Sequence, residues 1–562
     1  VTQVWLELTM PDYMADITRL VQTDGSTMQE ILTAGGKMLA CALGSLIASI
    51  LTAICATRIA ATFSAALREK LFRKVMSFSM EEIGHFSTAS LITRSTNDVT
   101  QIQMLIAIGL QLLVKAPIMA VWAICKIANK QWEWTFSTGV AVIVLLAVVG
   151  LCLLLVTPKF KKIQTLTDDL NRVTRENLTG LRVVRAYNAE RYQETKFEHA
   201  NQALTSTNLF AQRTLSFMMP SIQLVMSGLS LAIYWIGAVL INNARIAGKL
   251  NLFTDMMVFS QYAIQVVMSF MMLVMIFMLL PRASVSAKRI QAVLDTDPSI
   301  IDGTETDSNC NASGTIEFKN VSFHYPDEEE CVLKNITFTA KKGETIALIG
   351  STGCGKSTVI NLIPRFYDAS EGQVLVDGID VRKYPQKELR NKIGYVSQKA
   401  TLFTGTIRSN VAYGDNGQPS ASQEDVKNAI ATAQATDFVE NLGDQYDAYV
   451  AQGGSNFSGG QKQRISIARA IARHPEILIF DDSFSALDYK TDRILRKTLE
   501  ETCKDTTRII VAQRIGTIRD ADQIIVLDEG KIAGIGRHEE LMQTCDVYQQ
   551  IALSQLSKEE LA

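Results

Sequence analysis

The residues best suited to chemistry lie in "GSTGCGKST" and "LIFDDSFSALD". The first stretch follows the β-type run "TIALI" and opens a helical segment, the context of a phosphate-binding loop. Its glycines let backbone amides curl around phosphates, Lys356 reaches the β- and γ-phosphates, and the Ser357 hydroxyl ligates magnesium. A chance glycine-rich turn is the alternative. The loop comprises Gly350, Ser351, Thr352, Gly353, Cys354, Gly355, Lys356, Ser357 and Thr358.

The second stretch carries two adjacent carboxylates after an apolar run. Asp481 ends "ILIF", where nucleotide-hydrolysing proteins hold magnesium, an ion that prefers oxygen ligands. The alternative is a helix N-cap after a strand. The next position usually orients the attacking water and is glutamate in many such proteins, but here it is Asp482, one methylene shorter. The sequence therefore leaves open whether this site hydrolyses its nucleotide or only holds it.

A second anion cradle lies in "FSGGQKQR", Phe457 to Arg464. Ser458, Gly459 and Gly460 offer backbone amides and a hydroxyl at the start of the helical segment "QKQRISIARAIAR". At this point the chain resembles the ATP-binding cassette family, whose signature is Leu-Ser-Gly-Gly-Gln; Gln461 completes the match and Phe457 replaces the leucine. The resemblance covers essentially the whole length and implies ATP and Mg²⁺ as cofactors.

In that family two nucleotide domains close head to tail, with each ATP between one chain's phosphate loop and the other chain's signature. The resemblance thus implies that the two cradles of this chain serve different nucleotides. It also matches Tyr325 to the aromatic that stacks on adenine, for which a core tyrosine is the alternative. Gln398 matches the glutamine that contacts magnesium and water, beside the metal ligands Ser357 and Asp481. Asp488 matches the aspartate of the loop that crosses the dimer interface.

Two catalytic positions depart from the family pattern. Asp482 stands for glutamate, and Gln513 in "IIVAQRIGTI" stands for the switch histidine. Aspartate reaches about 1.5 Å less far, and a misplacement near 1 Å can cost about a hundredfold in rate. Glutamine hydrogen-bonds but cannot carry the imidazolium charge.

The pattern resembles the degenerate-site subunit of heterodimeric multidrug-type exporters, in which a second half-transporter supplies the hydrolytic site. The alternatives are a homodimeric lipid or peptide exporter and an ATP-regulated membrane protein that transports nothing.

Long apolar segments must position this machinery at a lipid bilayer. Each is about as long as a membrane-spanning helix requires. They are Met38 to Thr57, Met104 to Cys125, Trp134 to Pro158, Thr214 to Ala244 and Met256 to Pro281. The first apolar run, "VTQVWLELTM", stops at Pro11, which predicts a sixth helix whose start is missing; a short interfacial helix is the alternative. Thus we expect an exporter-type helical membrane domain with six transmembrane helices, the first truncated.

The charge of the connecting loops predicts the topology. Basic residues cluster after the second and fourth spans, around Arg68 and Arg182, whereas the loops around Asn129 and Asn243 carry few. Basic loops stay cytoplasmic, so the two long loops and the C-terminal region are expected on the cytoplasmic side of the cell membrane. The stretches Ser77 to Phe86 and Arg185 to Tyr192 resemble the two coupling helices of the exporter family, the second of which docks on the partner's nucleotide domain.

Composition sets the remaining limits. The 562 residues carry a net charge of −2, which gives no argument for a nucleic-acid partner, and nine cysteines show neither disulfide nor zinc spacing. Short β-branched runs alternate with helical segments after residue 313, which indicates an α/β domain with a largely parallel sheet. The expected organisation is a transmembrane domain at 1–290, a linker at 291–313 and a nucleotide-binding domain at 314–562.

Two features of the spans bear on the transported compound, expected to be a hydrophobic small molecule, a lipid or a peptide. The last span is rich in methionine, which suits either a wall that accepts varied apolar partners or ordinary packing. Gln261 and Gln265 lie within it and are expected to face the bundle interior. Lys115 is a charge inside a span, hence a functional candidate, or it extends to the cytoplasmic edge. The methionines are Met256, Met257, Met268, Met271, Met272, Met275 and Met278.

Overall fold

The computed structural model describes residues 1–22, 26–128, 130–305, 313–326, 328, 330–417 and 419–555, so Asn129 lies outside it. The chain divides into two units. The helical unit comprises Val1–Val75 and Ala89–Thr296, and the mixed unit comprises Met76–Thr88 and Asp297–Ala562. A short segment between two helices of the first unit therefore belongs to the second.

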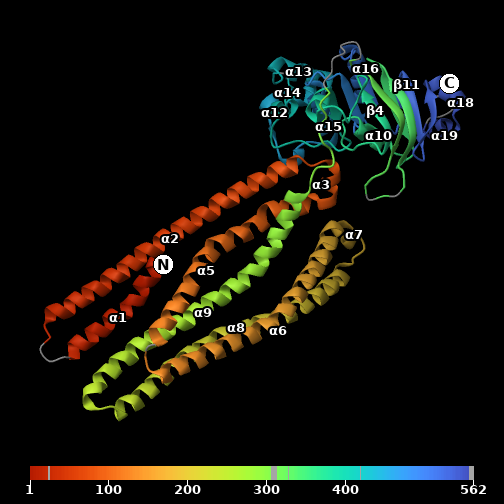
Figure 1. Ribbon diagram of the computed structural model, residues 1–562. Helices are drawn as coiled ribbons and strands as arrows, with labels where there is room; N and C mark the ends of the chain where they lie inside the picture. The colour runs from red at the N-terminus through yellow and green to blue at the C-terminus, as the bar shows by residue number, and fades with distance from the viewer. Residues whose placement is uncertain are drawn as a thin grey trace. The chain divides into compact units, whose positions relative to one another are not determined.

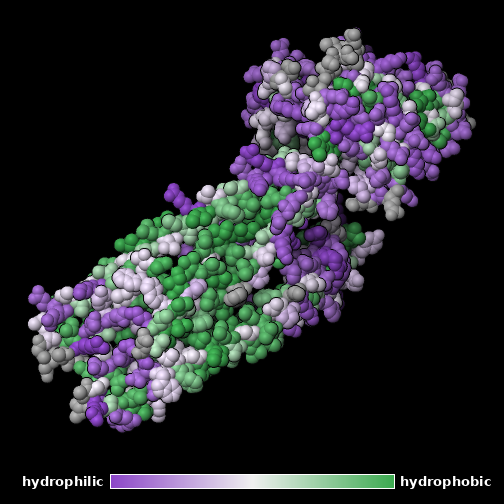
Figure 2. Space-filling model, viewed as in Figure 1, coloured by the Kyte–Doolittle hydropathy of each residue, from purple (hydrophilic) through white to green (hydrophobic). Residues whose placement is uncertain are grey.

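The helical unit is built from long helices with two short ones, α4 and α7, between them. They are α1 (Thr2–Gln22), α2 (Met28–Met76), α4 (Thr88–Thr93), α5 (Val99–Ala128), α6 (Trp132–Thr179), α7 (Leu181–Ala186), α8 (Glu190–Asn243) and α9 (Ile246–Asp295), with a π-helical turn at Arg94–Asp98. Helix α6 runs beside α8, and α5 runs beside α9 (Figure 1). Apolar surface extends along the middle of these helices (Figure 2).

Among the described residues, five helices are long and apolar enough to cross a membrane, which confirms the five predicted apolar spans. Helix α1, the expected sixth span, is not among them. The helix continues through Pro11 to Gln22, although the apolar run itself ends at Pro11. The Tyr262 hydroxyl lies 2.9 Å from the Leu8 carbonyl oxygen and 2.6 Å from the Asp12 carboxylate, so α9 holds α1 on both sides of the proline.

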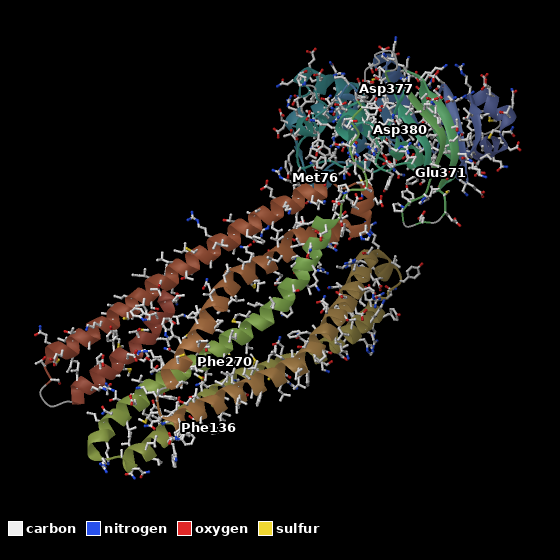
Figure 3. The ribbon with its side chains drawn as sticks, in the orientation of Figure 1. Met76, Phe136, Phe270, Glu371, Asp377 and Asp380 are labelled. Carbon is white, nitrogen blue, oxygen red and sulfur yellow. The ribbon has the colours of Figure 1, made fainter. Side chains whose placement is uncertain are left out.

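Aromatic side chains fill the core between α6, α8 and α9. Trp134 and Phe259 are buried with ring centroids 5.5 Å apart. A Cβ atom on Gly237 would lie 2.3 Å from the Met256 sulfur, so glycine lets α8 approach α9 closely. Phe270 of α9 also packs against this core, whereas Phe136 of α6 is exposed (Figure 3).

The polar residues of the spans differ in part from expectation. Lys115 forms an ion pair with Glu7 of α1 at 2.9 Å, so its ammonium group bonds within the helical unit. The carboxamide oxygen of Gln265 is buried, as expected, whereas Gln261 is exposed. Met268 and Met275 are exposed and Met256 is buried; the side chains of Phe277 and Met278 lie outside the described part of the chain.

The described part of the mixed unit contains three sheets. Its strands are β1 (Ile316–Phe323), β2 (Leu333–Ala340), β3 (Thr345–Gly350), β4 (Glu371–Val376), β5 (Ile379–Asp380), β6 (Ile393–Val396), β7 (Gly405–Thr406), β8 (Tyr449–Val450), β9 (Ile477–Asp481), β10 (Thr507–Val511), β11 (Gln523–Asp528) and β12 (Lys531–Gly536). The main sheet has the order β12-β11-β3-β10-β9-β6, the second sheet is antiparallel with the order β2-β1-β4-β5, and β7 pairs with β8. Glu371 begins β4, and Asp377 and Asp380 follow it (Figure 3).

Helices precede, connect or follow the strands of these sheets along the chain. They are α3 (Met80–Phe86), α10 (Lys356–Leu362), α11 (Gln386–Asn391), α12 (Ile407–Val411), α13 (Gln423–Thr432), α14 (Thr436–Glu440), α15 (Gly459–Ile471), α16 (Tyr489–Thr502), α17 (Ile515–Ile518), α18 (His538–Thr544) and α19 (Asp546–Gln555), with 3₁₀ turns at Gln445–Asp447 and Gln452–Gly454. Within the main sheet, all strands except β12 run parallel. Since Val511 of β10 pairs with both Leu348 and Asp481, the carboxyl ends of β3, β10 and β9 meet at one edge.

Candidate functional site

The loop between β3 and α10 has the backbone that a phosphate cradle requires. Gly350 adopts φ +156°, and a Cβ atom there would lie 2.1 Å from the Leu527 carbonyl oxygen, so only glycine fits. The Lys356 ammonium group donates hydrogen bonds to the Gly350 carbonyl at 2.9 Å and to the Ser351 carbonyl at 2.7 Å. The loop therefore holds its own cation above its amides, where the β- and γ-phosphates of a nucleotide would bind.

The predicted magnesium ligands are brought together at the same edge. The Ser357 hydroxyl donates to the Asp481 carboxylate at 2.9 Å. Burial raises the pKa of Asp481, the Ser357 hydrogen bond lowers it, and the neighbouring Asp482 raises it further. A hydroxyl and a carboxylate oxygen are ligands that Mg²⁺ accepts, with waters and phosphate oxygens completing the coordination. The donor set thus fits the ion, which would supply charge neutralisation on the phosphates.

Asp482 is held by both glutamines that the sequence singled out. The Gln513 amide donates to Asp482 Oδ2 at 2.8 Å, and the Gln398 amide lies 3.4 Å from the same oxygen. Asp482 is buried, adopts φ +46°, and burial raises its pKa against the hydrogen bond from Gln398. The carboxylate that stands at the water-orienting position therefore accepts hydrogen bonds from this chain's own side chains.

Tyr325 lies beside the phosphate-binding helix. Its hydroxyl is 3.1 Å from the Thr358 hydroxyl, and its ring meets Phe323 and Tyr367 edge-to-face at 5.0 Å and 5.4 Å. The ring is half-buried against the core of the second sheet. This position combines the packing of a core tyrosine with closeness to the loop, and stacking on adenine stays a prediction.

The second cradle begins helix α15. Ser458 is the N-cap of this helix. Its hydroxyl accepts from the backbone amide of Gln461 at 3.4 Å, and the side-chain oxygen Oε1 of Gln461 accepts from the backbone amide of Ser458 at 2.9 Å. A Cβ atom on Gly459 would meet no atom within 4 Å, whereas one on Gly460 would lie 3.2 Å from the Ala486 carbonyl oxygen. Asp488 is the N-cap of α16, and its carboxylate accepts from the Thr491 backbone amide at 3.0 Å. The hydrogen bonds described here for Ser458 and Asp488 join residues of the same helix start and do not reach the phosphate-binding loop.

Two further polar side chains of α15, the buried Gln463 and the partly buried Arg469, were not predicted from the sequence. The Gln463 amide donates to the Ser397 carbonyl at 3.3 Å, and the Arg469 guanidinium donates to the Thr401 carbonyl at 2.9 Å. Both therefore fix the segment that carries Gln398. Arg469 also lies under the stacked rings of Phe403 and Tyr413, which are 46% and 49% exposed. The available signal was a polar residue, Gln463, on the apolar face of a predicted helix.

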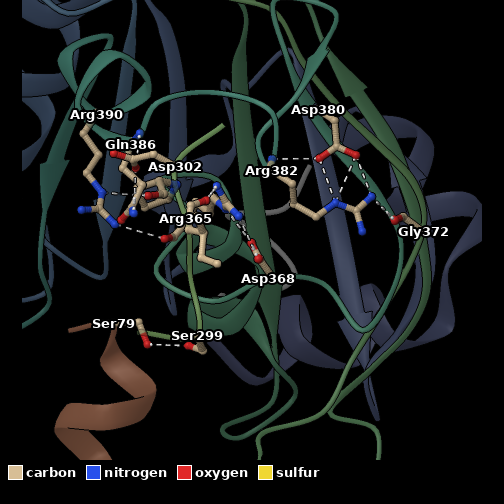
Figure 4. Close-up of polar contacts among 12 residues, drawn as sticks. Ser79, Ser299, Asp302, Arg365, Asp368, Gly372, Asp380, Arg382, Gln386 and Arg390 are labelled. Carbon is tan, nitrogen blue, oxygen red and sulfur yellow. Dashed lines mark hydrogen bonds and ion pairs between the residues drawn. The ribbon is translucent and has the colours of Figure 1, made fainter. Parts of the chain in front are cut away.

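The segment 76–88 packs within the mixed unit. The Glu82 carboxylate accepts hydrogen bonds from the backbone amides of Ser79, at 2.6 Å, and Ser299, at 2.8 Å. The hydroxyls of Ser79 and Ser299 lie 3.0 Å apart (Figure 4). A helix does form within the predicted first coupling segment, as α3. In the second predicted segment, α7 ends at Ala186 and α8 begins at Glu190.

Replacing Glu82 with alanine should loosen α3. Burial alone would raise the pKa of Glu82, but the hydrogen bonds from Ser79 and Ser299 lower it. Hydrogen bonds to a buried charge contribute about 1.5–3 kcal/mol, so hydrogen exchange of Met80–Phe86 should become roughly tenfold faster or more. Because the pKa is lowered, the stabilisation is present above the usual carboxyl pKa and is lost as pH falls through the lowered value. Glu81→Ala is the matched control, and equal acceleration in both variants would contradict the assignment.

Comparisons with known proteins agree with this geometry. Residues 333–485 match the model described as ABC transporter, and residues 1–270 match the ABC transporter transmembrane region. An uncharacterized ABC transporter ATP-binding protein of Mycobacterium tuberculosis is 39% identical over 523 residues, 92% of this chain and 87% of that protein. An ATP-dependent lipid A-core flippase of Pseudomonas fluorescens is 32% identical over 481 residues, 85% of this chain and 78% of that protein.

Among solved structures, a bacterial Atm1-family ABC exporter with ATP bound superposes on this chain with a TM-score of 0.80. The match has 26% sequence identity and covers 99% of this chain and 97% of that one. It therefore includes the helical unit as well as the mixed unit.

Proposed function

Since the chain belongs to the ABC transporter family and has its exporter fold, with a multi-pass membrane region and a cytoplasmic ATP-binding domain, we propose that it is one subunit of a heterodimeric exporter. Its own phosphate loop and Asp481 form a site that mainly holds ATP and Mg²⁺. Its signature, Ser458 to Gln461, completes the hydrolytic site of a second half-transporter. ATP binding closes the nucleotide domains, and hydrolysis at the partner's site resets them.

The hydrogen bond from Gln513 to Asp482 carries the proposal. A general base must lie within hydrogen-bond reach of the water that it activates. Asp482 is shorter than the usual glutamate, and its Oδ2 already accepts from Gln513 and lies near Gln398. The histidine that would contact the γ-phosphate is replaced by the same Gln513. Both departures weaken water activation on this chain's own loop, and neither touches the signature.

The intact second cradle supports a working partner site. Ser458 keeps its cap geometry and Gly459 has open space around it, so a phosphate group of another chain's nucleotide has room to approach the α15 amides. A chain that had lost all use of ATP would have no physical need for this arrangement. Division of labour requires such a signature, because it would complete the partner's site.

Coupling to transport is assigned to α3 and α7. Helix α7 and the turn after it expose apolar side chains at Leu181, Val183 and Tyr187. The stacked Phe403 and Tyr413 rings form an exposed aromatic surface of matching character, directly after the Gln398 segment. We assign this surface to the α7 segment of the partner subunit, so that movement of the Gln398 segment displaces the membrane helices.

The transported compound is assigned to the hydrophobic or amphipathic class. The lipid A-core flippases of Pseudomonas are relatives whose names record a lipid cargo. In this chain, Met268 and Met275 present exposed polarizable side chains on α9, which suits contacts with varied apolar compounds.

Two measurements test the proposal. Affinity purification of the tagged chain from its native membrane should recover a second half-transporter with glutamate and histidine at the two departed positions. Inside-out vesicles containing the pair should accumulate amphipathic compounds only with ATP and Mg²⁺. Recovery of the chain solely as a homodimer would overturn the heterodimer, and ATP binding without uptake of any compound would overturn transport.

A further inference from the structure

The ion pair between Glu7 and Lys115 lies deep in the helical unit. Lys115 stands near the middle of the apolar segment of α5, and its ammonium nitrogen is 2.9 Å from Glu7 Oε1 of α1. The Lys115 side chain is 25% exposed and the Glu7 side chain is 19% exposed. A charged pair in a membrane span is costly to maintain, and such residues commonly mark a substrate path. The pair therefore invites a function beyond joining two helices.

The hydrogen-bond capacity of this pair is only partly used. The Gln3 amide, the Ser45 hydroxyl and the Lys115 ammonium group all approach Glu7 Oε1, at 2.9, 3.4 and 2.9 Å. Among the described residues, none donates to Oε2. A lysine ammonium group has three donors, and one is used here. The node formed by Gln3, Glu7, Ser45 and Lys115 can thus still accept bonds at the carboxylate and donate bonds at the ammonium group.

The other charged pairs of α5 differ in this respect. Lys126 bonds Asp12 at 2.6 Å, and Asp12 is also within 2.6 Å of the Tyr262 hydroxyl. Lys130 bonds Asp255 at 2.6 Å. These contacts lie toward the end of α5, beyond Lys115, and their short distances suit a purely structural role. The Glu7–Lys115 node is the deeper one and has capacity left on both charges.

From this geometry we propose that the Glu7–Lys115 node binds the headgroup of a zwitterionic amphiphile, an inference that rests on the proposed export function. A compound with one charge would leave either Glu7 or Lys115 unpaired in an apolar span, at high cost. A headgroup with an ammonium and a phosphate replaces the internal ion pair on both sides: its phosphate binds Lys115 and its ammonium binds Glu7. The acyl chain then lies along the apolar surface of the helices (Figure 2).

The test uses lysophosphatidylethanolamine as probe, with lysophosphatidylglycerol of the same chain length as the anionic comparison. The chain and its copurifying partner are placed in nanodiscs, and ATPase stimulation is titrated. For the unmodified protein, the zwitterionic probe should half-saturate at a lower concentration. Glu7→Gln and Lys115→Gln should each raise that concentration about tenfold, since a bond to a charge is lost. Basal ATPase activity without probe reports the proposed function separately.

A charge exchange separates binding from helix joining. The double variant Glu7→Lys with Lys115→Glu keeps an ion pair but reverses its polarity, so stability should be retained while the response to the probe is weakened about tenfold. The matched control exchanges Lys130 and Asp255 and should leave the response unchanged. Should the reversed node fail to fold, Lys115→Arg, which keeps the charge, must retain the response. An unchanged response in Glu7→Gln and Lys115→Gln, or no preference for the zwitterionic probe despite normal basal activity, would overturn the proposal.

Discussion

Asp482→Asn should leave most of the transport activity of the assembled pair intact, whereas neutralising the partner's glutamate should lower it about a hundredfold. At this chain's site the side chain already acts as an acceptor for Gln513, at 2.8 Å, and an asparagine oxygen can accept the same bond. On the proposed assignment no working base is lost here, because Asp482 is shorter than glutamate and one of its oxygens is engaged by Gln513. At the partner's site the same change removes the group that positions the attacking water.

The measurement compares transport and ATPase rates of the two variants side by side. Lys356→Ala provides the reference for a site that can no longer hold nucleotide, since its ammonium group bonds the loop carbonyls and is expected to reach the phosphates of a bound nucleotide. In a homodimer, Asp482→Asn would be as damaging as Lys356→Ala. Equal losses in Asp482→Asn and the partner variant would refute the asymmetric assignment.

Ser458→Arg should remove most of the ATPase activity of the same pair, by about a hundredfold. Arginine places a long side chain over Gly459, where there is now open space, and so blocks the approach of the partner's γ-phosphate. It also removes the N-cap of α15, a loss of about 0.5–2 kcal/mol in helix stability.

The chain offers a control for the second effect. Ser422 caps α13 with the same reciprocal bonds, to Asp425, and lies away from the signature. Ser422→Arg should therefore match the stability loss of Ser458→Arg while leaving turnover nearly unchanged. Comparable loss of turnover in both variants would mean that the cap, and not phosphate contact, explains the result. Near-normal turnover in Ser458→Arg would place hydrolysis elsewhere.

Sequence reasoning was strongest where a function is carried by contiguous residues. The Gly350–Thr358 loop and the Ser458 cap each follow from local backbone demands, and the parallel register then brings Asp481 and Gln513 to the loop. Contacts between distant segments were not accessible in this way. The bond from Gln513 to Asp482 spans 31 residues, and the Lys115–Glu7 pair spans 108.

Local rules also gave an incomplete account of α1. The apolar run ends at Pro11, and proline removes one backbone hydrogen bond from a helix interior. The helix nevertheless continues, because it packs along α9 and Tyr262 contacts it on both sides of the proline. Tertiary packing outweighed the local signal. The same holds for Gln463, whose burial depends on the Ser397 carbonyl, a partner 66 residues away in sequence.

The assignment of α3 to the mixed unit has a consequence for biosynthesis. Ser79 and Ser299, which meet in that unit, are 220 residues apart in sequence. At a synthesis rate of about 5–20 residues per second, α3 leaves the ribosome roughly 10–40 s before its docking surface exists. During that interval the helices from α5 to α9 are made, so the loop must wait with the Glu82 carboxylate in water. The mixed unit completes its fold only when α3, a segment made early, docks on it. We expect misassembly and chaperone binding at this late step.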